Sequence, residues 1–312
     1  MNWIKIISMT LILLYSGADS YGIPLFSLDS EETTPTRVLN KSLLLWEKGA
    51  PGAMGDKEND KPRITVYFPS SQTTNRPAII ICPGGAYGML AISYEGYDIA
   101  RWLNKHDVVG VVLQYRVSPY RYPSPVLDGQ RAIRLVRARA KEWGIDPHKI
   151  GMMGFSAGGH LASTVATHFD KGNPEADDPV ERYSSRPDFL ILVYPVITMG
   201  KYTHAGSRRN LLGNRPEQCL IDTLSNEKHV TPDTPPTFIV HPRPDNVVSV
   251  ENSRMFYSAL LTNNVPVEFL ELSEGDHGLG CGEGELWLEW QNKCLAWLKR
   301  MGILSEEGRQ KP

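Results

Sequence analysis

The chain has 312 residues, of which 41% are hydrophobic and 22% charged, and its formal net charge is −2. This composition is ordinary for a globular protein, and a nearly neutral chain without a long basic run is not expected to bind nucleic acid or anionic lipid. About 290 residues remain after the N-terminal segment described next, which is enough for one large domain with a substantial core.

The first twenty residues have the organisation of a secretory signal peptide. Lys5 precedes an apolar stretch from Ile6 to Tyr15, and small residues follow it. The stretch is too short to span a bilayer, and cleavage is expected after Ala18 or Ser20. An uncleaved membrane anchor is the alternative. We therefore predict a signal peptide over residues 1–20 and a secreted or periplasmic protein.

Three further segments are predicted after the leader. Residues 21–61 are rich in Pro, Gly, Ser, Thr and charged side chains, so we expect an irregular N-terminal lead-in. Residues 62–303 have the pattern of a folded domain, and residues 304–312 form a polar C-terminal tail. No later apolar run approaches the length of a transmembrane helix, so no membrane association is expected once the leader is removed.

Short apolar runs suited to strands buried on both faces recur along the domain. The predicted strands are 63–68, 78–82, 108–115, 150–155, 189–194, 237–240 and 267–270. Helical spacing of apolar residues predicts helices over 96–105, 126–143, 158–166, 253–261 and 287–301. Strands that alternate with helices form βαβ units, so we predict an α/β fold with a mostly parallel central sheet and helices on both faces.

The sequence also predicts where some of the polar segments of the domain lie. The arginines of helix 126–143 are expected to be solvated, without a ligand. The stretches 169–186 and 198–236 are long for connecting loops, and such segments are usually surface excursions near a site.

A Gly-x-Ser-x-Gly sequence, Gly154 to Gly158, lies between the predicted strand 150–155 and the small, apolar residues of the following helix. This pattern at a strand-to-helix turn is typical of the nucleophile elbow of α/β-hydrolases. The turn is too tight for side chains at the glycine positions, so the serine is exposed at the carboxyl end of the strand. Ser156 is therefore the candidate nucleophile.

A serine hydroxyl needs a base within hydrogen-bond reach, and the base needs an acceptor that fixes its tautomer. In α/β-hydrolases these partners follow the serine in the order Asp or Glu, then His. Asp245 lies in the turn after strand 237–240, and His277 lies between glycines in the loop after strand 267–270. We therefore predict Ser156, Asp245 and His277 as the catalytic residues.

Other polar residues compete for these roles. The rival histidines are His160, His168, His204, His229 and His241, and none of them follows the last predicted strand. Asp276 adjoins His277, and the side chains of sequence neighbours usually diverge. Asp222, Asp233 and Glu271 are weaker rivals of Asp245.

Acyl transfer also needs two backbone N–H groups aimed at the developing oxyanion. One is expected from Ala157, the residue after the nucleophile. The other is expected from the glycine-rich turn that directly follows strand 78–82, with Gly85 and then Ala86 as the candidates.

The four cysteines do not indicate a disulfide-dense scaffold. Cys82 is expected to be a buried thiol, and whether Cys281 and Cys294 form a disulfide stays open. No Cys/His cluster has the spacing of zinc ligands, and we expect neither a metal nor a cofactor.

With these residues in hand, the chain resembles the esterase branch of the α/β-hydrolases that is related to bacterial acetylxylan and feruloyl esterases. The resemblance extends from about Trp46 to Leu298, and it rests on the stretches 82–87, 94–96, 114–117, 151–162, 206–213 and 275–278. It implies the α/β-hydrolase fold, no cofactor, and the same triad and oxyanion residues. It also draws attention to Glu95 and Arg116, for which we expect a buried ion pair that braces the oxyanion turn, with two solvated side chains as the alternative and no catalytic role for either.

The resemblance implies a secreted serine esterase that removes acetyl or other short acyl groups from a carbohydrate such as acetylated xylan, or from a small ester. A peptidase of the prolyl-oligopeptidase type is one alternative, and the short lead-in argues against it because those enzymes carry a large additional domain. A non-catalytic binding module on the same fold is the other. The substrate and the oligomeric state stay open.

Overall fold

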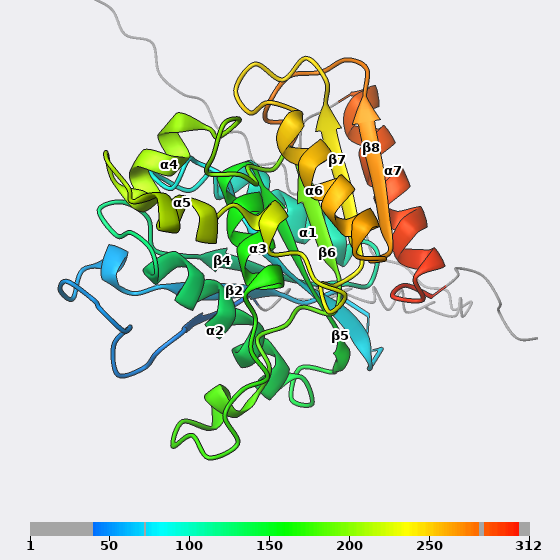
Figure 1. The fold of residues 1–312 in the computed structure, drawn as a ribbon. Helices are drawn as coiled ribbons and strands as arrows, with labels where there is room; N and C mark the ends of the chain where they lie inside the picture. The colour runs from blue at the N-terminus through cyan, green and yellow to red at the C-terminus, as the bar shows by residue number, and fades with distance from the viewer. Residues whose placement is uncertain (1–39, 72, 281–283, 306–312) are drawn as a thin grey trace, which may run out of the picture. The chain divides into compact units, whose positions relative to one another are not determined.

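The computed structural model describes residues 40–71, 73–280 and 284–305. The predicted leader and Cys281 lie outside these residues, as does most of the predicted tail. Figure 1 shows the arrangement of the elements. No helix in the described part of the chain is long and apolar enough to cross a membrane.

Eight strands form one sheet in the order β1-β2-β4-β3-β5-β6-β7-β8. Their bounds are Lys41–Leu44 (β1), Arg63–Tyr67 (β2), Arg76–Cys82 (β3), Val109–Gln114 (β4), Ile145–Phe155 (β5), Leu190–Val193 (β6), Thr237–Pro242 (β7) and Val267–Leu272 (β8). The six neighbouring strands β4-β3-β5-β6-β7-β8 pair in parallel. Strand β2 is antiparallel to both β1 and β4. The prediction of a mostly parallel α/β sheet is confirmed.

In the part of the chain that the structure describes, seven α-helices connect or cover the strands. They are Asp98–Asn104 (α1), Ser124–Arg139 (α2), Ala157–Thr167 (α3), Ala205–Leu212 (α4), Gln218–Thr223 (α5), Glu251–Thr262 (α6) and Glu285–Arg300 (α7). Because side chains alternate between the faces of a strand, the sheet contributes to two cores. One core packs against α2, α3 and α6, and the other packs against α1 and α7.

The central strands are apolar on both faces, which is why they read as continuous hydrophobic runs. All seven residues of β3 are buried, as are all four of β6. Their carboxyl ends meet at one edge of the sheet, where the connections to the helices must supply any side chains of a site.

The structure corrects the prediction that residues 21–61 are irregular throughout. Residues 41–44 lie within the predicted irregular segment but form β1, which pairs with β2 in the register Lys41↔Val66 to Leu44↔Arg63. Only one of its four residues is even partly shielded from solvent. The strand has only four residues and its two leucines are adjacent, so the segment lacks the alternating apolar pattern by which longer strands are predicted.

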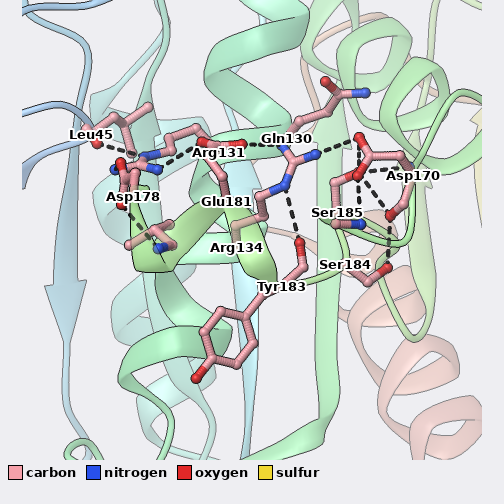
Figure 2. Close-up of polar contacts among 12 residues, drawn as sticks. Leu45, Gln130, Arg131, Arg134, Asp170, Asp178, Glu181, Tyr183, Ser184 and Ser185 are labelled. Carbon is pink, nitrogen blue, oxygen red and sulfur yellow. Dashed lines mark hydrogen bonds and ion pairs between the residues drawn. The ribbon is translucent and has the colours of Figure 1, made fainter. Parts of the chain in front are cut away.

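The structure also corrects the expectation that the arginines of α2 are solvated. Arg131 and Arg134 are mostly buried, and Arg131 pairs with Asp178 and Glu181 at 2.7 Å each. Arg134 pairs with Asp170 and donates to the Tyr183 carbonyl. Figure 2 shows both guanidinium groups directed at the 169–186 stretch. These arginines therefore hold that stretch on α2 instead of facing solvent.

The two long polar stretches have different places in the fold. Residues 169–186 follow the C-terminus of α3 and lie at the end of the sheet where the parallel strands begin, so the expectation that they lie near the site was wrong. Residues 198–236 contain α4 and α5, beside the carboxyl ends of the strands. This second stretch reaches the glycine-rich turn after β3, as described next.

Candidate active site

Ser156 occupies a strained turn between β5 and α3, with φ 52° and ψ −119°. A Cβ atom on Gly158 would lie 2.0 Å from the Cys82 carbonyl oxygen, and one on Gly154 would lie 2.3 Å from the Gly158 carbonyl oxygen. Only glycine fits at these two positions, which explains the Gly-x-Ser-x-Gly pattern. The close approach of β3 also sets the glycine-rich turn against the serine.

The structure brings the three predicted triad residues together. The Nε2 atom of His277 lies 2.8 Å from the Ser156 hydroxyl, and its Nδ1 atom lies 2.6 Å from Oδ2 of Asp245. In this arrangement Nδ1–H donates to the carboxylate, so Nε2 is left to accept the serine proton. The side chain of Asp245 is fully enclosed and that of His277 is 15% exposed.

Asp245 is held by three groups besides His277. Its Oδ1 atom accepts the backbone N–H groups of Val247 and Val248 at 2.8 Å each. Nε2 of His241 lies 3.3 Å from Oδ2. Burial alone would raise the pKa of Asp245, but hydrogen bonds from His241, His277 and Val248 outweigh it and hold the pKa below its ordinary value. The group is therefore a carboxylate in the folded protein at neutral pH.

The glycine-rich turn lies beside the serine. A Cβ atom on Gly84 would be 2.9 Å from Cβ of Ser156. The Gly84 N–H donates to Glu95, whereas the N–H groups of Gly85, Ala86 and Ala157 have no acceptor among the described residues. These three N–H groups are therefore available to a developing oxyanion.

The glycine-rich turn after β3 requires positive φ angles at two successive residues. Gly85 has φ 123°, and a Cβ atom there would meet the Met89 carbonyl oxygen at 2.3 Å. Ala86 also has a positive φ, 56°. Its carbonyl accepts a hydrogen bond of 2.8 Å from the side-chain amide of Asn210, on α4. The 198–236 stretch thus supports the turn directly.

Glu95 and Arg116 do not pair, which corrects the expectation drawn from the resemblance. Glu95 accepts the Gly84 N–H at 2.7 Å and the Tyr194 hydroxyl at 2.8 Å. Arg116 pairs instead with Asp128 on α2, at 2.7 Å. Of these two residues, therefore, Glu95 is the one that hydrogen-bonds to the oxyanion turn.

The competing residues have other partners. His160 lies between the Tyr87 hydroxyl and the Leu224 carbonyl, His204 caps α4, and His168 stacks on His229. His241 was considered as a rival base, but it supports Asp245. Asp222 pairs with Lys228, and Glu271 pairs with Arg243 and Arg254.

Sequence reasoning missed three contributors to the site: Tyr194, His241 in its supporting role, and Asn210. The Tyr194 ring lies 4.7 Å from the His277 ring, centroid to centroid. Its φ of 38° is strained for a residue other than glycine, and strain of this kind clusters at functional sites. Its position as the last residue of the predicted strand 189–194 was the only available signal.

A cavity of about 350 Å³ opens beside the candidate base. Its lining comes from two short stretches of the chain, which are Asp276, His277, Gly278 and Leu279, and Gly284, Glu285, Leu286 and Trp287. Apolar and acidic side chains therefore both face this space. Among the described residues, no group of three or more His, Cys, Asp or Glu side chains could hold a metal ion.

The sequence matches the model of the BD-FAE family over residues 64–260, a range that contains Ser156 and Asp245 and ends before His277. It is 38% identical to endo-1,4-beta-xylanase B of Butyrivibrio fibrisolvens over 73% of this chain and 36% of that protein. It is 33% identical to an acetylxylan esterase of Xylanibacter ruminicola over 80% of this chain and 50% of that protein. The chain thus spans half or less of the length of these two relatives.

A solved structure shares both sequence and fold with this chain. It is the acetyl ester-xyloside bifunctional hydrolase from Caldicellulosiruptor lactoaceticus, which is 42% identical, with a TM-score of 0.79. The alignment covers 85% of this chain and 97% of that structure. The relationship therefore extends over almost the whole of the described sheet and its helices.

Proposed function

This chain belongs to the BD-FAE family and has the α/β-hydrolase fold, and from that premise we propose that it is a serine carboxylic-ester hydrolase that removes acetyl groups from a carbohydrate such as acetylated xylan. The observation that carries the proposal is the hydrogen-bonded series from Ser156 through His277 to Asp245, set beside backbone N–H groups without acceptors.

The mechanism follows from the direction of these hydrogen bonds. Ser156 Oγ attacks the ester carbonyl while Nε2 of His277 takes its proton, and Asp245 stabilises the imidazolium that forms. The N–H of Ala157 and that of Gly85 or Ala86 bind the oxyanion. His277 then gives its proton to the leaving alcohol, and later activates the water that hydrolyses the acyl-enzyme.

The substrate class is proposed from the relatives together with the cavity beside His277. The similar protein from Xylanibacter ruminicola is named an acetylxylan esterase, and the one from Caldicellulosiruptor lactoaceticus is named an acetyl ester-xyloside bifunctional hydrolase. The leaving alcohol must reach Nε2 of His277 to be protonated, so a sugar would occupy the space next to this residue. Trp287 and the carboxylates of Asp276 and Glu285 line that space, and they suit the apolar faces and hydroxyl groups of a sugar.

Two measurements test the activity. Wild-type protein should release acetate from acetylated xylan and hydrolyse p-nitrophenyl acetate, and Ser156→Ala should do neither while keeping the wild-type thermal transition. Ser258→Ala, an exposed serine on α6, is the matched control and should retain full activity. A peptide amide is expected to be left intact. Acetate release by Ser156→Ala at the wild-type rate would contradict the proposal.

Export is proposed separately, from the pattern of residues 1–20. Expression of the full chain in a bacterial host, followed by mass spectrometry of the mature N-terminus, tests it. A product that begins after Ala18 or Ser20 in the periplasm or medium is expected. An intact N-terminus in the cytoplasm would contradict export without affecting the proposed chemistry.

A further inference from the structure

One fully enclosed polar side chain joins the two loops of the site that sequence reasoning treated separately. Glu95 is 2% exposed and lies in a π-helical turn, Ser93–Tyr97. Its Oε2 atom accepts the N–H of Gly84, the residue before the oxyanion turn's candidate donors. Its Oε1 atom accepts the hydroxyl proton of Tyr194. Turns of this π type occur frequently at functional sites.

Tyr194 extends this contact to the loop that carries the base. Its hydroxyl oxygen accepts the backbone N–H of Gly280 at 2.8 Å, three residues after His277. Its ring packs on the His277 ring, with centroids 4.7 Å apart. Tyr194 is completely buried and is itself held in a strained backbone conformation. The side chain therefore contacts the base loop at two points, through its ring and through its hydroxyl.

The hydrogen bonds of this series converge on the Glu95 carboxylate from both sides. The Gly280 N–H donates to Tyr194, Tyr194 donates to Glu95, and the Gly84 N–H donates to the other oxygen of Glu95. A carboxylate, which only accepts, satisfies every donor. A Cβ atom on Gly280 would lie 3.4 Å from Cγ of Glu95 and 2.7 Å from the Tyr94 ring, so the base loop also packs directly on this turn.

We propose that Glu95 and Tyr194 are positioning residues that fix the distance between the oxyanion turn and the base loop. This inference rests on the proposed function, and neither residue touches the reacting atoms. Catalysis requires the oxyanion donors and the His277 imidazole to be correctly placed at the same moment. A misplacement of about 1 Å can reduce the rate about a hundredfold. A buried carboxylate that is bonded to the oxyanion turn directly and to the base loop through Tyr194 limits such a displacement.

Two conservative variants remove parts of the link. Tyr194→Phe keeps the ring on His277 and removes the hydroxyl, and Glu95→Gln keeps the shape but replaces one acceptor by a donor. Each should lower kcat for p-nitrophenyl acetate about tenfold and leave KM within about twofold, because the loss lies in the transition state. The double variant should resemble the poorer single variant, since both changes break the same link.

The protein contains a matched control. Tyr120 is a buried tyrosine whose hydroxyl also donates to a carboxylate, that of Asp60, and accepts a backbone N–H, that of Met54. Tyr120→Phe should lower the melting temperature about as much as Tyr194→Phe does and leave kcat unchanged. A Tyr194→Phe enzyme with kcat within twofold of wild type would overturn the proposal. So would an equal kcat loss in Tyr120→Phe.

A second readout keeps the test independent of the substrate. The rate at which a fluorophosphonate probe labels Ser156 depends on the activated serine and not on a sugar. Labelling of Tyr194→Phe should be about tenfold slower than labelling of wild type. If wild type is labelled but hydrolyses no ester, the proposed function fails while the positioning role is still measured. If Glu95→Gln does not fold, Tyr194→Phe alone decides.

Discussion

Arg116 and Asp128 form an ion pair that is completely closed to solvent, with Nη2 of the arginine 2.7 Å from Oδ1 of the aspartate. The Arg116 backbone N–H donates to the same carboxylate at 2.8 Å. Another guanidinium nitrogen donates to the Pro51 carbonyl at 2.7 Å. This pair therefore ties the end of β4 to the start of α2 and to the segment before β2.

Breaking this pair from one side should be costly. Arg116→Met leaves the Asp128 carboxylate buried without its partner, and we expect a loss of about 3–5 kcal/mol in the free energy of unfolding. Arg116→Met combined with Asp128→Leu should recover most of the loss, because no uncompensated charge remains. Urea unfolding of the three proteins measures both effects. A single variant within about 1 kcal/mol of wild type would show that the pair is not the main support of this region.

Asp245→Asn should reduce kcat about 10³–10⁴-fold, since the amide cannot stabilise the imidazolium and presents a donor to His277. The Val247 and Val248 N–H groups still have an acceptor in this variant, so the fold should persist. Steady-state kinetics with p-nitrophenyl acetate and a thermal melt check the two statements. Asp222→Asn, which removes only an exposed pair with Lys228, is the control and should keep wild-type kinetics.

Gly85→Ala should lower kcat by about 10²–10³-fold, the usual effect of losing one oxyanion donor. The added methyl group would meet the Met89 carbonyl, so the turn must shift. Ala86→Gly is the companion variant. It relieves a positive φ and should keep both the fold and the activity. Equal kcat values for Gly85→Ala and wild type would exclude this turn as a source of the oxyanion donors.

His160 should make stability depend on pH. Burial lowers the pKa of His160 to about 4 from an ordinary value of 6.5. In the unfolded chain His160 becomes protonated below about pH 6.5, whereas in the folded protein it stays neutral down to about pH 4. The free energy of unfolding therefore falls as the pH drops from 6.5 to 4. The loss is about 2 kcal/mol by pH 5, at about 1.4 kcal/mol for each unit of pKa.

The measurement is a difference between two proteins. His160→Gln offers hydrogen-bonding groups to Tyr87 and Leu224 but cannot titrate, so its unfolding free energy should fall less than that of wild type between pH 8 and pH 5. The exposed His148 provides the control, and His148→Gln should keep the wild-type pH dependence. Parallel curves for wild type and His160→Gln would contradict the assignment.

Arg131→Met should loosen the 169–186 stretch without affecting catalysis. It removes ion pairs with Asp178 and Glu181 and a hydrogen bond of 2.8 Å to the Leu45 carbonyl. Trypsin should cleave the variant within residues 169–186 faster than it cleaves wild type. The ratio kcat/KM should be unchanged, because the stretch lies where the parallel strands begin, whereas Ser156 directly follows the carboxyl end of β5. A lower kcat/KM in a folded variant would indicate coupling between the two ends.

The sequence predicted every strand of the described sheet except β1, and it predicted the three residues that meet at the candidate site, because these features depend on local patterns. Residues 78–82 of β3 and all of β6 are buried on both faces and appear as unbroken apolar runs. Ser156 lies in a turn that accepts only glycine at positions 154 and 158, which gives the recognisable Gly-x-Ser-x-Gly pattern. Asp245 and His277 each follow a strand, in the chain order expected of the fold. The expected α/β-hydrolase fold is confirmed, and the triad geometry is present.

What the sequence could not show depends on which loops meet in space. Arg116 has one carboxylate partner, and choosing Asp128 over Glu95 requires knowing that the start of α2 faces the end of β4. The charges of α2 have the same periodicity whether the helix face is solvated or covered. Tyr194 carries no motif, and its contact with Gly280 joins residues 86 positions apart. Such contacts are products of the fold and leave no trace in spacing.

Ser156 and His277 are separated by 121 residues, and the base follows β8, a strand that pairs only with β7 at the edge of the sheet. A chain that has ordered only its first six strands would present the serine at its elbow with no base to activate it. Esterase activity should therefore appear late during refolding, after most of the secondary structure, because it requires the last strand to pair. Under the proposed function, the appearance of activity during refolding should therefore report the completion of the sheet, and molecules that lack β8 should be inactive.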